Sequence, residues 1–432
     1  DESDGVVGDG LGVYEVTVEP LADGIYDIFV QLEDTAGNIS EDSEALNVTI
    51  DTLAPQRPTI DLRDIDDTGR NDMDDTTIGD PLLTVGEVNV RYSAELDQRV
   101  IIKDGETVID DFIFDAAQDA TDGGATDLFG QRLIDFVANA VAFGIPAEGA
   151  HPISVEVFDV AGNRSAQSEE LLITVDFTPP AAPSIPDLNA SSDTGMFNDD
   201  NVTATQEAHF VGTAEANSHI RIYATPISGA LPAGVLGVPQ LVGEGVVRSD
   251  ESDGDGTDGL GVWEVTIEPL EDAIYEITAE VEDKAGNISQ LSEALTMEVD
   301  TYKPNTPYLD LIAASDSGRH DEDNVTNDNT PTFTMSTQDD PNDPTHLIAA
   351  NYKFRLYVRP EAAAVGVTGE ELLLYSSFAD FADFTALDFL QRTVQQLPDG
   401  YHNFKLEVED RAGNISDDYL LDVIIDTQAY QG

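Results

Sequence analysis

The chain has 432 residues, 41% of them hydrophobic, and its 86 acidic against 19 basic side chains give a formal net charge of −67. This apolar share is typical of folded proteins, whereas the charge repels nucleic acid and opposes compaction unless cations, salt or an elongated shape offset it. The absence of cysteine excludes disulfides, thiolate zinc sites and a cysteine nucleophile, and no apolar run approaches the ~20 residues of a membrane-spanning helix.

A short motif, Asp-x-Ala-Gly-Asn-x-Ser, occurs four times along the chain. Its copies begin at Asp34, Asp159, Asp283 and Asp410, which are 125, 124 and 127 residues apart. Internal repeats of this length indicate a tandem array of similar domains. Each copy lies between two stretches of alternating apolar and polar residues. The motif therefore predicts a turn between antiparallel strands, where Gly and Asn tolerate positive φ.

The repeat divides the chain into one partial and three full units. Residues 1–51 match residues 250–300 at 32 of 51 positions, which predicts that they form only the C-terminal half of a repeat. The first half either precedes Asp1 or comes from another chain. The full repeats span 52–176, 177–300 and 301–426, and residues 427–432 begin the next linker. At each junction an aspartate is followed by a proline, which stiffens the connection and favours a linear rod.

In chain order, the partial repeat predicts strands at 13–18, 25–32 and 45–50. The second repeat adds an insertion in which apolar residues at helical spacing follow a potential N-cap, Asp127. This predicts a helix of ~4 turns. The residues with helical spacing are Leu128, Arg132, Leu133, Phe136, Val137, Ala140 and Val141.

The third repeat has the clearest strand pattern. We expect strands near 183–188, 208–214, 219–225, 241–248, 261–267, 274–282 and 294–299. Seven short strands separated by Gly, Pro and Asp turns predict an all-β fold of tandem seven-stranded immunoglobulin-like β-sandwiches. The disulfide and the strand-C tryptophan of antibody domains are absent.

The fourth repeat contains an aromatic insertion whose secondary structure the sequence does not define. Its members are Phe378, Phe381, Phe384, Leu387 and Phe389. Each of the two insertions either packs on its own domain or makes a lateral contact.

A second motif lies near the start of each full repeat and reads Asp-Leu-x4-Asp-(Ser/Thr)-Gly-x4-Asp-(Asp/Asn)-x-Thr. Its aspartates are Asp61, Asp67 and Asp74, then Asp187, Asp193 and Asp200, then Asp310, Asp316 and Asp323. Constant spacing between carboxylates in otherwise variable loops suggests a constraint on their oxygens. Hard cations such as Ca²⁺ take about six to eight oxygen ligands. The alternative is a set of solvated acidic turns without a ligand.

Sandwich topology places this loop of one repeat opposite the Asp-x-Ala-Gly-Asn turn of the next, across the junction aspartate. We therefore predict Ca²⁺ at the domain junctions, because clustered carboxylates repel one another without a cation. One composite site draws on Asp67, Asp74, Asp176 and Asp283, and the other on Asp193, Asp200, Asp300 and Asp410. The first junction offers Asp51 and Asp159, and the last loop offers Asp316 and Asp323.

A further acidic stretch covers residues 250–259. Asp253, Asp255 and Glu264 fall at EF-hand positions, but Asp258 stands where that motif requires glycine and no helices are predicted around it. We interpret the EF-hand match as coincidental and leave open a looser local ion site.

The repeated Asp-x-Ala-Gly-Asn-x-Ser turns, the Asp-Ser-Gly type loops and the segment 210–215 (Phe-Val-Gly-Thr-Ala-Glu) resemble bacterial immunoglobulin-like repeats of giant surface adhesins and biofilm-associated proteins. The resemblance spans essentially the whole chain and is weakest in the two insertions. It implies Ca²⁺ ions that rigidify the domain junctions of an extracellular stalk on the cell surface.

The expected function is therefore a calcium-rigidified stalk segment of an adhesin, with an unknown surface ligand and with neighbouring copies as further potential partners. One alternative is a self-assembling surface layer, sheath or filament, and another is a carbohydrate- or protein-binding module. We do not expect an enzyme, because the six histidines are scattered and neither a nucleophile motif nor a phosphate loop occurs. We also expect no nucleic acid partner and no membrane insertion of this segment.

Overall fold

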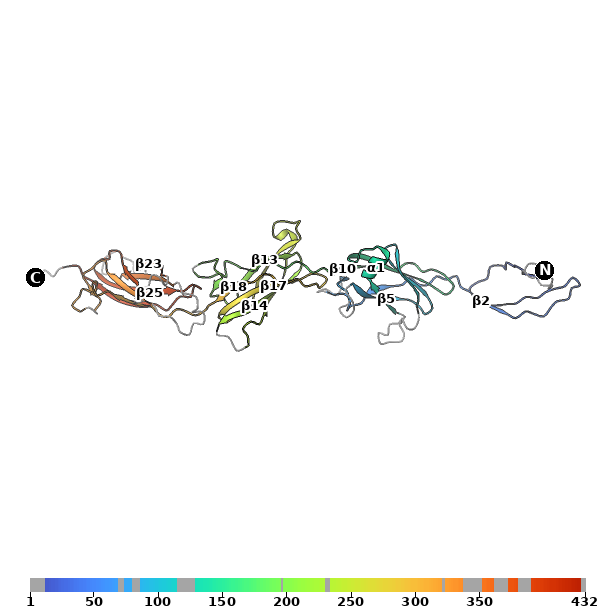
Figure 1. Cartoon of the computed structure of the whole chain (residues 1–432), viewed down its shortest axis with the longest axis horizontal. Helices are drawn as coiled ribbons and strands as arrows, with labels where there is room; N and C mark the ends of the chain where they lie inside the picture. Colours follow the sequence, from blue (N-terminus) through green and yellow to red (C-terminus); the bar gives the residue numbers. More distant parts are fainter. Residues whose placement is uncertain are drawn as a thin grey trace. The chain divides into compact units, whose positions relative to one another are not determined.

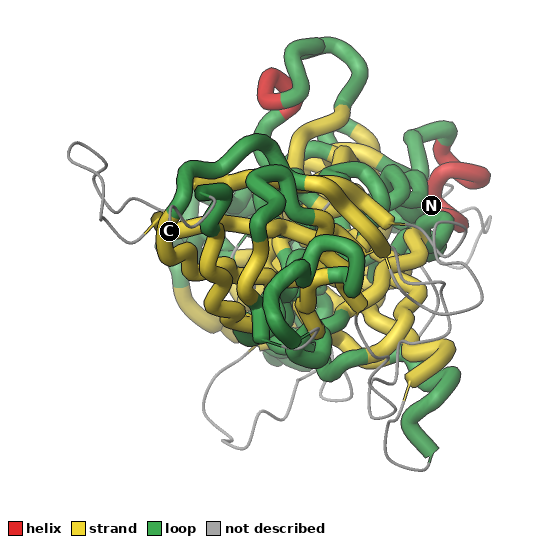
Figure 2. Tube along the Cα trace, turned by 90° about the vertical axis from the view of Figure 1, so that its left-hand side faces the viewer, coloured by secondary structure: helices red, strands yellow, loops and turns green. Residues whose placement is uncertain are grey.

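Strands, many of which alternate inward and outward side chains, form the framework of the described chain. The computed structural model describes residues 12–68, 74–79, 86–114, 129–195, 197–229, 234–320, 323–336, 352–360, 372–379 and 390–428. The chain divides into two units. Unit 1 comprises Asp1–Thr178 with Lys284–Gly286, and unit 2 comprises Pro179–Asp283 with Asn287–Gly432. The helical segments of the described chain are α1, in unit 1, and the short 3-10 helix η1, in unit 2 (Figure 2).

In unit 2, the 177–300 repeat forms a sandwich of two sheets (Figure 1). The smaller sheet has the order β11–β13–β16, with bounds Asp187–Leu188, His209–Glu215 and Leu260–Thr266. The larger sheet has the order β12–β18–β17–β14–β15, with bounds Val202–Thr203, Leu295–Val299, Ala273–Glu282, His219–Gly229 and Gln240–Val246. Every second side chain of β17 is buried, and Trp263 from β16 is fully buried in the core between the sheets.

The 301–426 repeat, also in unit 2, has the same arrangement. Its smaller sheet is β19–β21–β24, with bounds Tyr308–Leu311, Thr332–Ser336 and Leu390–Thr393. Its larger sheet is β20–β26–β25–β22–β23, with bounds Val325–Thr326, Tyr419–Ile425, Gly400–Glu409, Tyr352–Pro360 and Leu372–Ala379. Phe378 belongs to β23, whereas the remainder of the predicted aromatic insertion, from 380 to 389, lies outside the described residues.

In unit 1, the 52–176 repeat forms the third sandwich. Its smaller sheet is β3–β5–β8, with bounds Ile60–Leu62, Glu87–Ser93 and Phe129–Asp135. Its larger sheet is β4–β10–β9–β6–β7, with bounds Thr76–Thr77, Leu171–Val175, Gly149–Phe158, Arg99–Asp104 and Thr107–Ile113. The predicted all-β fold of tandem immunoglobulin-like domains is thus confirmed.

The helix of this repeat is shorter than the sequence predicted and starts later. Residues 129–135 form β8, and α1 spans Phe136–Phe143. Its N-cap is Asp135, whose carboxylate accepts the Ala138 N–H at 2.7 Å. The prediction of a helix from Leu128 was wrong because pairing with β5 holds the preceding residues in a strand.

The expected seven strands per sandwich become eight, because the first strand is split. Its first part pairs antiparallel within the smaller sheet, as β11 does with β13. Its second part pairs parallel with the last strand in the larger sheet, as β12 does with β18. A two-residue strand carries no alternation that a sequence pattern could reveal. The loop between the two parts therefore crosses from one sheet to the other.

The partial repeat forms a hairpin of β1 (Gly24–Ile28) and β2 (Leu46–Ile50). The strand predicted at 13–18 is absent from the described residues of this segment, which begin at 12. Tyr14 is 75% exposed, whereas its counterpart Trp263 is fully buried in a complete sandwich. A few strands with half a core are marginally stable by themselves, which explains the shorter pairing.

Candidate functional site

Each full repeat carries its aspartate-rich motif on the loop that crosses between the sheets. In the 177–300 repeat, Ser192 and Asp193 donate their backbone N–H groups to the Asn189 carbonyl, at 2.7 and 3.0 Å. The Thr203 hydroxyl, on β12, donates to the Ser192 carbonyl at 2.5 Å. These bonds fix the loop and hold Asp193 inside the protein, where it is only 5% exposed.

The Asp193 carboxylate has little solvation. Its Oδ2 accepts the Asn201 N–H at 3.3 Å, whereas its Oδ1 is buried and accepts no hydrogen bond from the described residues. Burial raises the pKa of Asp193, and the charges of Asp200 and Asp199 raise it further. A buried charge without compensation is costly, so this oxygen favours a proton or a cation.

The other two full repeats reproduce this geometry. Asp67 and Asp316 are 9% and 4% exposed, and the Oδ1 of each is buried without a hydrogen-bond partner among the described residues. Burial raises the pKa of both carboxyls, to which the charge of Asp74 adds at Asp67 and that of Asp323 at Asp316. The same buried oxygen therefore recurs in three loops whose intervening residues differ.

The third aspartate of each motif closes a small turn at the end of the loop. Its Oδ1 accepts the backbone N–H two residues on, at 3.2, 3.2 and 3.1 Å in the three repeats. The aspartates that make these bonds are Asp74, Asp200 and Asp323. This bond orients one oxygen of each carboxylate.

These loops fit a hard cation in one respect, since a buried anionic oxygen without a donor suits an oxygen-preferring ion such as Ca²⁺. Within the described parts of the chain, however, no three His, Asp or Glu side chains converge to hold a metal ion. The Ca²⁺ sites therefore stay a prediction.

The turn aspartates form bonds within their own Asp-x-Ala-Gly-Asn turns. In the fourth turn, Asp410 accepts the Asn414 backbone N–H at 2.8 Å and its side-chain amide at 3.0 Å. Asp34, Asp159 and Asp283 accept the equivalent pair of bonds. The four Asn-x-Ser asparagines are thus primarily turn residues.

The aspartates of two of these turns differ in how deeply they are buried, and their pKa values differ accordingly. Burial raises the pKa of Asp410 to about 6 despite the hydrogen bonds from Asn414 and Gly413, which act in the opposite direction. The Asn163 side chain lowers the pKa of the more exposed Asp159. The same turn therefore titrates differently in two repeats.

The junction aspartates also have defined local roles. The Oδ1 atoms of Asp51, Asp176 and Asp300 each accept the backbone N–H two residues on, at 3.0 Å. Within unit 1, the Asp51 carbonyl accepts the Asn163 side-chain amide at 3.0 Å, and within unit 2 the Asp300 carbonyl accepts that of Asn414 at 2.8 Å. These two turn asparagines, Asn163 and Asn414, thus tie their repeats to the preceding junction.

The second predicted composite site lies entirely in unit 2. Here the turn of the fourth repeat meets the aspartate-rich loop of the third, because the Thr194 hydroxyl donates to the Ala412 carbonyl at 2.5 Å. The Asp200 Oδ2 is bonded by the Arg411 Nε at 2.8 Å. Sequence reasoning missed this arginine because no local pattern links residues 211 positions apart.

The first predicted composite site is divided between the units. Asp67, Asp74 and Asp176 belong to unit 1, and Asp283 belongs to unit 2. Each keeps the local bonds given above, and their joint action stays a prediction.

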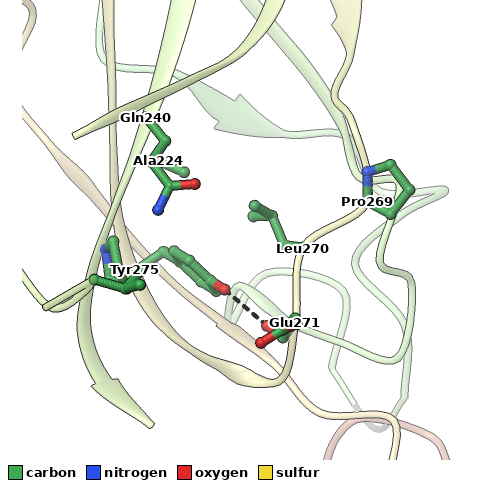
Figure 3. A pocket seen from close by; sticks show the side chains of 8 residues that line it. Ala224, Gln240, Pro269, Leu270, Glu271 and Tyr275 are labelled. Carbon is green, nitrogen blue, oxygen red and sulfur yellow. Dashed lines mark hydrogen bonds between the residues drawn. The ribbon is translucent and has the colours of Figure 1, made fainter. Parts of the chain in front are cut away.

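A pocket of about 280 Å³ lies on the 177–300 repeat (Figure 3). It is lined by Ala224, Pro226, Val235, Gln240, Pro269, Leu270, Glu271 and Tyr275. Burial, and then the charges of Glu271 and Asp272, raise the pKa of Tyr275 to about 12. The hydroxyl thus stays protonated and donates to the Glu271 carbonyl at 2.9 Å, as immunoglobulin-like domains do at their tyrosine corner.

In the acidic stretch at 250–259, some carboxylates accept hydrogen bonds from nearby backbone N–H groups. Asp253 accepts the Asp255 N–H at 2.9 Å, and Asp258 accepts the Leu260 N–H at 2.9 Å. η1 spans Asp250–Ser252, so no EF-hand helices flank the loop, as expected. The looser ion site stays untested.

Three stretches of the chain, residues 2–52, 246–301 and 303–355, match the family model described as a bacterial Ig-like domain. These stretches are therefore similar to bacterial Ig-like domains, which confirms the resemblance seen in the motifs of the first, third and fourth repeats. No curated protein matches the chain. Domains of this class are typically structural, non-enzymatic modules of bacterial surface proteins.

Among solved structures, the FN1–FN3 domains of chicken CNTN1 are 11% identical, with 86% of this chain and 99% of that chain covered at a TM-score of 0.28. Fibronectin(III)-like modules of Clostridium thermocellum CbhA are 13% identical, with 49% of this chain and 85% of that chain covered at a TM-score of 0.24. In the described residues, neither helix has the length and apolar character needed to cross a membrane.

Proposed function

We propose that the chain is an extracellular stalk segment of a large bacterial surface adhesin, in which Ca²⁺ stiffens the array and holds a binding region away from the cell. One observation carries the proposal. An aspartate that is at least nine-tenths buried recurs at one loop position in three repeats, each time with an oxygen that accepts no hydrogen bond from the described residues.

The residues that would hold the cation follow from this geometry. Asp67 and Asp316 would supply the buried oxygens, and Asp74 and Asp323 would supply a second carboxylate in each loop. A bound Ca²⁺ would supply the positive charge that compensates them. The loop bonds to β12 and its equivalents keep the buried carboxylate in place, so that little conformational entropy is lost on binding.

A calcium titration followed by calorimetry tests the proposal. A cation that binds only the folded chain raises the melting temperature, because binding contributes about 2.7 kcal/mol per site at 100 times the dissociation constant. We expect Ca²⁺ to raise the melting temperature, and Asp67→Asn or Asp316→Asn each to reduce the rise. Asp417→Asn, at a carboxylate that is 84% exposed, is the matched control.

Small-angle scattering with and without EDTA tests the mechanical part. We expect a narrower distribution of shapes with Ca²⁺ than with EDTA. Equal melting temperatures with and without Ca²⁺, together with identical scattering, would contradict the proposal.

A further inference from the structure

At the joint between the third and fourth repeats, an arginine of the fourth repeat pairs with an aspartate of the third. The Arg411 Nε lies 2.8 Å from the Asp200 Oδ2, and the two side chains are only 29% and 15% exposed. Both residues belong to unit 2. A charge-assisted bond at this degree of burial is screened less by solvent than a surface ion pair.

The backbones on the two sides of this joint lie very close together. A Cβ placed on Gly195 would lie 2.1 Å from the Arg411 carbonyl oxygen, and one placed on Gly413 would lie 2.8 Å from the Gly195 Cα. The Thr194 hydroxyl bonds the Ala412 carbonyl beside them. These contacts set the position from which the guanidinium reaches Asp200.

The equivalent positions in the other repeats differ. The residue after the turn aspartate is Thr35, Val160 and Lys284 in the first three turns and Arg411 in the fourth. In the described parts of the chain, the counterparts of Asp200, which are Asp74 and Asp323, bond to backbone N–H groups and to no basic side chain. Asp200 thus differs from Asp74 in having an arginine partner among the described residues.

We propose that the Arg411 guanidinium closes the joint between the third and fourth repeats in place of a divalent cation. The guanidinium occupies an oxygen that a metal ion would use, and its charge repels a second cation. This joint then stays closed without Ca²⁺. The inference rests on the proposed function only in assigning Ca²⁺ to the other loops.

The first test measures the joint itself. Because the chain has no cysteine, Glu276→Cys and Leu420→Cys allow a spin label on each repeat of this pair, and electron resonance gives their distance distribution. In EDTA we expect a narrow distribution with Arg411 and a broad one with Arg411→Thr, which introduces the residue type found in the first turn. Arg248→Thr removes another arginine that pairs with a carboxylate, Glu264, of the same repeat and serves as the matched control. Equal distributions in EDTA for the chain with Arg411 and for Arg411→Thr would overturn the proposal.

The second test measures competition for the oxygen. In the full chain with Asp67→Asn and Asp316→Asn, calorimetric titration reports mainly on the third-repeat loop. We expect Arg411→Thr to tighten Ca²⁺ binding by about tenfold or more, and Arg411→Lys to give a smaller gain because lysine lacks the planar fork. Unchanged or weaker binding in Arg411→Thr would overturn the proposal.

The outcomes separate the two proposals. If no loop binds Ca²⁺ in the unaltered chain, the calcium-stalk function fails, while a narrow distribution in EDTA that depends on Arg411 still supports the joint. If Ca²⁺ binds but EDTA broadens the distribution of the unaltered chain as much as Arg411→Thr does, the arginine proposal fails alone. Fluorescence of Trp263, the single and fully buried tryptophan, verifies that each variant is folded.

Discussion

At the scale of single residues, burial decides how an aspartate of this chain behaves. Asp159 and Asp410 occupy the same position of the same turn and accept the same bonds from an asparagine. The pKa of Asp159 is lowered by those bonds, whereas burial raises that of Asp410 to about 6. The turn sequence alone predicts the hydrogen bonds but not the desolvation, because packing from another repeat supplies the latter.

The pH dependence of stability should therefore differ between these two turns. Between pH 3.8 and about 6, the folded chain binds more protons at Asp410 than the unfolded chain, so the free energy of unfolding falls as pH rises. The full effect is about 3 kcal/mol, because a pKa difference of one between the folded and unfolded chain corresponds to about 1.4 kcal/mol. Urea unfolding in EDTA should show this fall, and Asp410→Asn should flatten it.

Asp159→Asn is the control for this prediction, because the pKa of Asp159 is shifted in the opposite direction to that of Asp410. A lowered pKa contributes stability that is present above the ordinary value and is lost as pH falls, so its removal should not flatten the fall between pH 4 and 6. An unchanged slope in Asp410→Asn would show that other groups carry the pH dependence.

At the scale of elements, much of the fold could be predicted from the sequence. Alternating apolar residues located the longer strands, since a two-residue period places one face of β17 in the core. The split first strand was not predictable, because Val202 and Thr203 make a strand only by pairing with β18. The start of α1 was misplaced for a similar reason, since strand pairing of residues 129–135 overrides their helical spacing.

The candidate site likewise has a part that the sequence predicts and a part that it does not. Carboxylate spacing predicts Asp67, Asp193 and Asp316 as candidate ligands, because that spacing belongs to one loop. Arg411 carried no local signal, since its contact with Asp200 depends on how two repeats meet. A motif thus predicts which carboxylates lie in one loop, but it does not predict which distant basic residue pairs with one of them.

The meeting of loop and turn at Gly195 gives a prediction at this scale. Gly195 and Gly254 both have φ +98, but a Cβ at Gly195 would lie 2.1 Å from the Arg411 carbonyl oxygen, whereas one at Gly254 has nothing within 4 Å. Both changes to alanine strain the backbone by about 1–3 kcal/mol. Gly195→Ala should cost at least ~2 kcal/mol more, because overpacking adds to the strain. Urea unfolding followed by Trp263 fluorescence measures the loss of unfolding free energy in each variant. Equal losses would show that the backbone at the joint moves apart to accommodate the added Cβ.

At the scale of the whole molecule, the formal charge of −67 opposes folding through self-repulsion. Monovalent salt and a bound divalent cation reduce this repulsion in different ways. Monovalent salt screens all exposed carboxylates alike, whereas a bound cation compensates the few that are buried. Buried charges are screened less by mobile ions, so the two contributions should be separable by experiment.

We expect NaCl to raise the melting temperature in EDTA as its concentration increases from about 0.1 to about 1 M, because the screening length falls from about 10 to about 3 Å. At the higher salt concentration, millimolar CaCl₂ should raise it further, since the buried oxygens of Asp67 and Asp316 remain uncompensated by screening. MgCl₂ at the same ionic strength should give a smaller rise, because Mg²⁺ demands strict octahedral geometry and loses water reluctantly. Equal effects of the two divalent salts would indicate screening of the surface charge rather than binding in the loops. Differential scanning calorimetry of the unaltered chain and of Asp67→Asn/Asp316→Asn decides between them, because only binding in the loops depends on those two aspartates.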